Sequence, residues 1–102
     1  MAFGRFSGRV VAEKRSWVEE KVVVEAEDGL HARPARMVWE EARRYGAEVR
    51  IHKESLDLDA KSIFDIMRLN ATKGTELIIR ARGEDAKKAV QVLVRLISSA
   101  TS

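Results

Sequence analysis

The chain contains no cysteine in its 102 residues. Without cysteine a protein has neither a disulfide framework nor a thiolate nucleophile. The simplest setting for such a chain is a reducing compartment, and we expect a cytoplasmic protein. No apolar run approaches the roughly 20 residues that cross a bilayer, and the first residues lack the apolar core of a secretory signal. We therefore expect no membrane insertion.

Several motifs of catalysis and cofactor binding are also missing. The chain has no G-x-x-x-x-G-K-[ST] phosphate loop, no G-x-G-x-x-G dinucleotide fingerprint and no H-E-x-x-H zinc motif. Its two histidines, His31 and His52, lie 21 residues apart and have no cysteine beside them to complete a metal site. No nucleophile elbow supports Ser-His-Asp catalysis. We expect neither a metal nor a cofactor.

Positive charge is concentrated at the start of the chain. Residues 1–17 carry four basic side chains against one acidic one, whereas the remaining 85 residues carry 15 of each sign. The net charge of +3 therefore belongs to the leading segment. Nucleic-acid binding proteins place their excess positive charge on a face of the folded domain, so this distribution argues against a nucleic-acid partner. We expect 1–17 to be a basic, flexible extension and 18–102 to be one folded domain.

Hydrophobic periodicity from residue 18 onward predicts seven elements. The expected strands cover 21–26, 49–52, 56–59 and 76–82, and the expected helices cover 32–44, a short stretch from 62 onward, and 86–97. Each helix is apolar on one side only. We therefore expect an α/β (α+β) protein in the order β-α-β-β-α-β-α, an open-faced β-sandwich with a four-stranded antiparallel sheet and three helices on one face.

The same periodicity predicts which side chains face the core. They are Val22, Val24 and Ala26 in the first strand; Ala35, Val38, Trp39 and Ala42 in the first helix; Ile63, Ile66 and Met67 in the second; Leu77, Ile79 and Ala81 in the last strand; and Ala86, Ala89, Val90, Leu93 and Ile97 in the last helix.

His31 stands immediately before the first predicted helix, in the run GLHARPA at 29–35. A helix start presents unpaired backbone N–H groups and the positive end of the helix dipole, which together bind phosphate. An unperturbed imidazole, with a pKa near ~6.5, offers a neutral nucleophilic nitrogen at physiological pH. The guanidinium of Arg33 can pair with phosphate oxygens. These residues predict a phosphoryl-accepting site, although a histidine at this position can also be an ordinary surface or capping residue.

Three blocks of sequence, GLHARPA at 29–35, AKSIFDIM at 60–67 and KGTEL at 73–77, resemble HPr, the histidine-containing phosphocarrier family of the phosphoenolpyruvate-dependent sugar phosphotransferase system. The resemblance runs from Val18 to Ile97 without gaps. It implies the HPr fold, phosphorylation of His31 by enzyme I, and transfer of the phosphoryl group to a sugar-specific enzyme IIA. It also implies that Arg33 helps to hold and release the phosphate. Such a protein is a carrier rather than an enzyme, since it turns over only through its partners, and we expect a monomer.

The resemblance further implies a regulatory serine at Ser62. In many family members an ATP-dependent HPr kinase/phosphorylase modifies this serine, and the product acts with a catabolite-control transcription regulator or slows phosphotransfer. The residues themselves predict an N-cap at Ser62, because Asp65 completes an S-x-x-D capping pattern. Kinase-regulated members usually have glycine in place of Asp65, whose carboxylate would repel an incoming phosphate. Regulation at Ser62 therefore stays an open alternative to a purely structural cap.

By the resemblance, Ile63, Phe64 and Met67 would form the family's apolar docking patch beside the phosphoryl site. For Ile63 and Met67, which lie on the inward stripe, a core position and a partner contact both stay open. Phe64 lies off the inward stripe of its helix, so we expect it to be exposed for a partner.

Two other functions compete with phosphoryl transfer. One is an HPr-like regulatory module that acts through Ser62 and the docking patch; members specialised in this way tend to lack the histidine, which is present here. The other is an α/β sandwich that binds nucleic acid through its basic extension.

Overall fold

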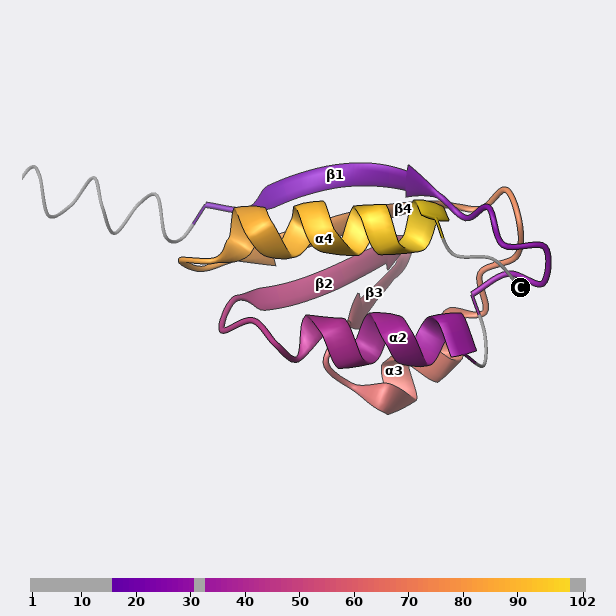
Figure 1. The fold of residues 1–102 in the computed structure, drawn as a ribbon, viewed down its shortest axis with the longest axis horizontal. Helices are drawn as coiled ribbons and strands as arrows, with labels where there is room; N and C mark the ends of the chain where they lie inside the picture. The colour runs from indigo at the N-terminus through magenta and orange to yellow at the C-terminus, as the bar shows by residue number, and fades with distance from the viewer. Residues whose placement is uncertain (1–15, 31–32, 100–102) are drawn as a thin grey trace, which may run out of the picture.

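The computed structural model describes residues 16–30 and 33–99 (Figure 1). Residues 1–15 of the predicted extension and the predicted phosphoryl acceptor His31 lie outside the described residues. The elements, in chain order, are β1 (Val18–Val23), α2 (Arg33–Ala42), β2 (Glu48–Lys53), β3 (Leu56–Asp59), α3 (Ile63–Leu69), β4 (Glu76–Arg82) and α4 (Ala86–Ser99). This order is the predicted β-α-β-β-α-β-α.

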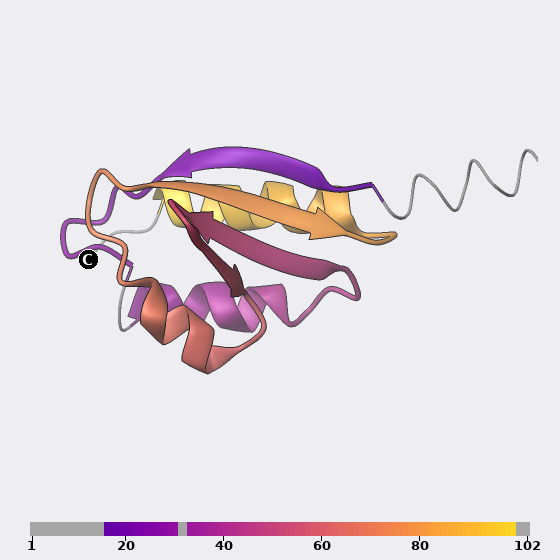
Figure 2. The same cartoon turned by 180° about the vertical axis from the view of Figure 1, so that it is seen from behind.

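The four strands form one antiparallel sheet in the spatial order β1-β4-β2-β3. The last strand in the sequence therefore lies between the first two strands, and Figure 2 shows it from the side away from α4. Its inward residues Leu77, Ile79 and Ala81 are fully buried, as the alternation predicted.

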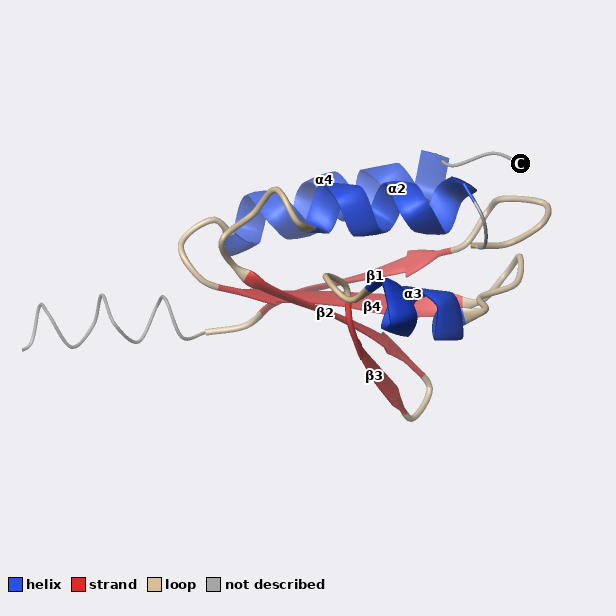
Figure 3. Ribbon diagram, turned by 90° about the horizontal axis from the view of Figure 1, so that it is seen from below, coloured by secondary structure: helices blue, strands red, loops and turns tan. Residues whose placement is uncertain are grey.

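The helices complete the core on one side of this sheet. Figure 3 shows α2 and α4 side by side over the sheet, with α3 next to β3. Contacts of α4 with β1 and β4, and of α3 with α2 and β3, agree with this view. All five residues predicted to face inward from α4 are buried. The predicted open-faced fold of four antiparallel strands and three helices is confirmed.

Three local predictions were wrong. The first strand begins at Val18 rather than residue 21 and ends at Val23, because pairing with β4 sets its length, although Val24 and Ala26 are buried beyond it as predicted. The helix predicted to end at residue 44 ends at Ala42, and a turn follows. Of the two positions left open for Met67, the core position is wrong: its side chain is 71% exposed, and Leu69 is buried on the inward side of the helix.

The open face of the sheet carries a group of paired charges and one aromatic ring. The indole of Trp17, just before β1, lies against the guanidinium groups of Arg80 and Arg82, with ring-centroid distances of 4.3 and 4.5 Å. Arg80 also pairs with Glu19, and Arg82 pairs with Glu48. Stacking of this kind covers the ring and joins the start of β1 to the end of β4.

Asp85 joins the start of α4 to the segment before β2. Its carboxylate accepts hydrogen bonds from the backbone N–H groups of Gly46, at 2.9 Å, and Ala47, at 2.8 Å. The bond from Gly46 is the main reason that the pKa of Asp85 is lowered, and the bond from Ala47 adds to it against the opposing effect of burial.

We predict that Asp85→Asn lowers the free energy of unfolding at pH 7 by about 1–2 kcal/mol, because a charged acceptor of two backbone bonds is lost. A lowered folded-state pKa gives stability that is present above the unfolded pKa, near ~4, and is lost as the pH falls through the folded value. The difference between the two proteins should therefore shrink in acid. Urea unfolding at pH 7 and pH 3 measures this, with Glu20→Gln, an exposed strand residue, as the matched charge removal. Equal losses at both pH values would contradict the assignment.

Candidate functional site

The residues before His31 are fixed to a loop from a distant part of the sequence. Leu30 is buried, and its backbone N–H donates to the carbonyl of Ala71 at 2.7 Å, which forms an isolated antiparallel bridge between the two residues. The chain is therefore anchored up to the residue that precedes His31.

Gly29 allows this close approach. Its φ is +78°, and a Cβ built there would lie 2.3 Å from the Ala71 carbonyl oxygen and 3.0 Å from the Thr72 Cα. A side chain at this position would meet backbone rather than a movable group, so both the conformation and the space require glycine. The close packing of the backbone therefore explains why the run GLHARPA begins with glycine.

The positive end of the dipole of α2, the helix that follows His31, is not offset by an acidic side chain in its first turn. α2 begins at Arg33, which is exposed, and Pro34 occupies its first turn, where a missing N–H costs no intrahelical bond. No acidic residue stands in the first turn of α2. The dipole and the unpaired N–H groups at this end are therefore not opposed by a neighbouring carboxylate within the helix, which favours an anion there.

Ser62 is the N-cap of α3, as predicted. Its hydroxyl oxygen accepts a hydrogen bond from the backbone N–H of Asp65 at 3.3 Å. The Asp65 carboxylate does not return to Ser62: it accepts from the backbone N–H of Asp59 at 2.9 Å. The Asp59–Asp65 contact holds the end of β3 against the start of α3, and it keeps a negative charge in the same turn as the Ser62 hydroxyl.

The predicted docking residues divide into two settings. Phe64 and Met67 are 76% and 71% exposed, whereas Ile63 is half-buried. A groove of about 480 Å³ runs between α2 and α3, and its walls include Ala35 and Trp39 from α2 and Ile63, Ile66 and Met67 from α3. The structure therefore brings Ile63 and Met67 together with α2, while Phe64 is not among the residues that line the groove.

Trp39 is a groove residue that sequence reasoning assigned to the core. It is half-buried, its indole N–H donates to the Lys61 carbonyl at 3.1 Å, and the Arg43 guanidinium lies 4.5 Å from its ring centroid. The apolar stripe of α2 could not separate a core position from a groove wall. The size and polar N–H of tryptophan, which favour partly exposed positions, were the available signal.

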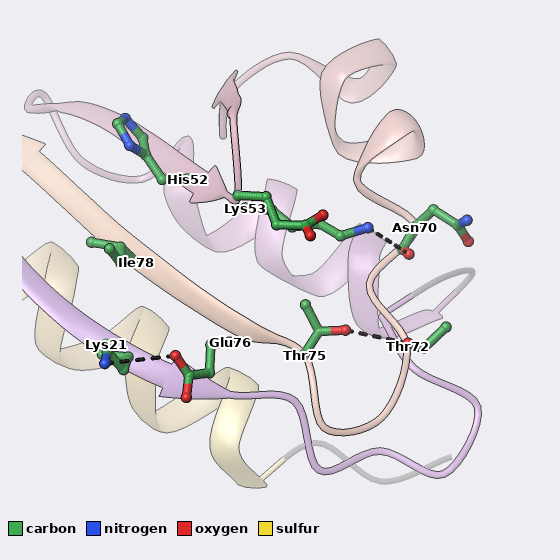
Figure 4. Close-up of a pocket in the computed structure, with 9 residues that line it drawn as sticks. Lys21, His52, Lys53, Asn70, Thr72, Thr75, Glu76 and Ile78 are labelled. Carbon is green, nitrogen blue, oxygen red and sulfur yellow. Dashed lines mark hydrogen bonds and ion pairs between the residues drawn. The ribbon is translucent and has the colours of Figure 1, made fainter.

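A second hollow, of about 760 Å³, lies between the open face of the sheet and the loop 70–75 (Figure 4). Lys53 extends along it and donates to the carbonyls of Leu69 and Asn70, where it compensates the negative end of α3. The hydroxyl groups of Thr72 and Thr75 lie 3.2 Å apart. These contacts hold the loop against which Gly29 and Leu30 pack.

His52, the second histidine, is half-buried on the open face. Its Nε2 lies 3.1 Å from the Asp57 carboxylate and 3.4 Å from the Arg80 guanidinium. It thus links β2 to both neighbouring strands rather than standing in solvent. Among residues 16–30 and 33–99, no group of three histidine or acidic side chains could hold a metal ion. None of the described helices has the length and apolar content needed to cross a membrane.

Comparison with known proteins identifies this arrangement. Residues 18–99 match the family model described as the PTS HPr component phosphorylation site. The phosphocarrier protein HPr of Vibrio cholerae is 39% identical over 79 residues, which cover 78% of this chain and 93% of the relative. The HPr-like protein Crh of Bacillus subtilis is 38% identical over 80 residues, which cover 78% and 94%.

A solved structure agrees with the sequence comparison. The crystal structure of HPr from Bacillus anthracis superposes with a TM-score of 0.78 at 35% identity, and the match covers 81% of this chain and 99% of that one. The anchored loop before His31, the unopposed start of α2 and the S-x-x-D cap of α3 occur in a chain that matches this family over most of its length. The chain belongs to the HPr family, the phosphocarriers of the phosphotransferase system.

Proposed function

We propose that this chain carries a phosphoryl group on His31, which it accepts from enzyme I and donates to a sugar-specific enzyme IIA. The observation that carries the proposal is the setting of GLHARPA. Leu30 is tied to Ala71 and α2 starts at Arg33, so His31 falls between an anchored residue and the positive end of a helix. That setting favours a group that becomes strongly negative.

The transfer needs no cofactor. A neutral ring nitrogen of His31 attacks the phosphorus held by enzyme I; the new P–N bond forms as the bond from phosphorus to the donor atom breaks, and its electron pair stays on the donor. Arg33 and the first N–H groups of α2 stabilise the charge on the phosphoryl oxygens. Transfer to enzyme IIA is the same step in reverse, with His31 as the leaving group. The chain therefore has no turnover without its partners.

Partner proteins would dock on the surface formed by α2 and α3. Phe64 and Met67 are exposed on α3, and the groove between α2 and α3 supplies apolar surface that reaches Ala35 in the first turn of α2. Exposed Arg33 adds positive charge, whereas Arg36 is paired with Glu40. Apolar anchors with a charged rim suit a transient partner. We further propose that the protein works in the cytoplasm as a monomer. Residues 1–17 are proposed to be an extension outside the carrier domain, except for Trp17, which packs on Arg80 and Arg82 of the sheet.

We predict that incubation with enzyme I and phosphoenolpyruvate labels the protein with one acid-labile phosphate, and that His31→Ala abolishes the label. The matched control is His52→Ala, which removes the other histidine and should keep full labelling. Phosphate mapping by mass spectrometry at neutral pH locates the site. Normal labelling of His31→Ala would refute the proposal.

The Gly29 contact predicts a graded effect on stability. Gly74 has a similar φ of +89°, but a Cβ there would have nothing within 4 Å. Gly74→Ala should therefore cost only the left-handed backbone penalty, about 1–2 kcal/mol. Gly29→Ala should cost a further ~1–3 kcal/mol, because its Cβ meets the Ala71 carbonyl. Urea unfolding of the two variants measures the difference, and equal losses would show that the close approach is not needed.

A second candidate function is an HPr-like regulatory module that acts through Ser62. The 38% identity to the HPr-like protein Crh favours it, as does the exposure of Phe64 and Met67 beside Ser62. In this function an HPr kinase/phosphorylase modifies Ser62, and the product binds a catabolite-control transcription regulator. The Asp65 carboxylate opposes the modification by repulsion.

We predict that a cognate HPr kinase labels Ser62 slowly and that Asp65→Asn raises the rate. Asn keeps an oxygen for the Asp59 N–H and removes the charge, so the cap of α3 should survive. Kinase assays with ATP on wild type, Asp65→Asn and Ser62→Ala measure this, and label on Ser62→Ala would indicate another site. Absence of label on both wild type and Asp65→Asn would remove the second candidate.

A further inference from the structure

The loop that leads to His31 is acidic. Glu25, Glu27 and Asp28 precede Gly29 within four residues, and all three are exposed. A phosphoryl group on His31 adds a charge close to two, and like charges within about 10 Å repel at ordinary ionic strength. The loop therefore carries charge of the same sign as the group that the proposed function places beside it.

Lys73 lies in the loop 70–75 and faces this acidic loop. Its Nζ lies 2.7 Å from Glu27 Oε1. The hydrogen bond, with the attraction of opposite charges, lowers the pKa of Glu27 and raises the pKa of Lys73. Glu25 acts on Lys73 in the same direction. Both side chains of the pair are at least half exposed, so the pair adds little to stability.

The two loops do not depend on this ion pair for their positions. Backbone hydrogen bonds join Leu30 to Ala71, Val24 to Thr75 and Gly74 to Val24, at 2.7, 2.9 and 2.8 Å. Figures 1 and 2 show the loops side by side at one end of the sheet. Removal of either charge should therefore alter the electric field next to His31 and leave the backbone in place.

We propose that Glu27 and Lys73 set the equilibrium of phosphoryl transfer to His31 through this field: Lys73 favours the phosphorylated form, and Glu27 opposes it. The inference rests on the proposed function and names two residues that tune it. Both are positioning residues, which act through the charge on His31; neither is a catalytic residue.

The two charges predict opposite effects. With enzyme I and a fixed ratio of phosphoenolpyruvate to pyruvate, the equilibrium constant for phosphorylation should fall roughly two- to fivefold in Lys73→Gln and rise by a similar factor in Glu27→Gln. This is the size expected for a unit charge within about a Debye length in a water-like medium. The double variant should lie near wild type. In about 1 M salt all differences should disappear, because the Debye length falls to about 3 Å.

The control is the pair Glu48–Arg82, which has the same 2.7 Å separation at the other end of the sheet. Arg82 lies about 20 Å from Glu76 along β4, and Lys73 precedes Glu76 in the loop at that far end. Glu48→Gln and Arg82→Gln should leave the equilibrium unchanged, and urea unfolding should find similar stabilities for Lys73→Gln and Glu27→Gln. A shift in the same direction for Lys73→Gln and Glu27→Gln, or no shift, overturns the inference. If wild type takes no phosphate on His31, the proposed function fails instead.

Discussion

The hydrogen bond from the Leu30 N–H to the Ala71 carbonyl joins two loops that are 41 residues apart in the sequence, and the candidate site depends on it. It is possible only because Gly29 has no side chain to strike the same carbonyl. This bond holds the backbone of Leu30, the residue directly before His31, in place. The start of α2, three residues after Leu30, and the acidic loop lie at the same end of the molecule (Figure 1).

The sheet order explains why these loops meet. β4 lies between β1 and β2, and Val23 at the end of β1 pairs with Glu76 at the start of β4. The segments that extend beyond this pair must leave the sheet side by side. Backbone bonds of Val24 with Thr75 and Gly74 continue the pairing past the strand ends. The candidate site is therefore a product of long-range antiparallel pairing, while the chemistry proposed for it comes from the seven-residue run GLHARPA.

Local periodicity predicted what local forces determine. The inward faces of β4 and α4, the N-cap at Ser62 and the exposure of Phe64 all follow from spacing along one element. What depends on a partner element could not be predicted from spacing. The length of β1 is set by β4, and Met67 is exposed because a helix of seven residues turns its buried side toward Ile66 and Leu69. The bridge from Asp85 to Gly46 spans 39 residues and leaves no mark in either local sequence.

At this site the anchored backbone fixes the geometry, whereas the exposed charges affect mainly the local electrostatic potential. Buried Leu30 and Gly29 cannot change without a steric or solvation cost, so they fix geometry. Glu27 and Lys73 contribute little to stability, because exposed ion pairs rarely do. A charge that costs little to change can still shift the energy of a phosphoryl group nearby, since a dianion responds to every charge within a Debye length. Under the proposed function, the carrier adjusts how strongly it holds its phosphate through surface residues, without altering the fold around the acceptor.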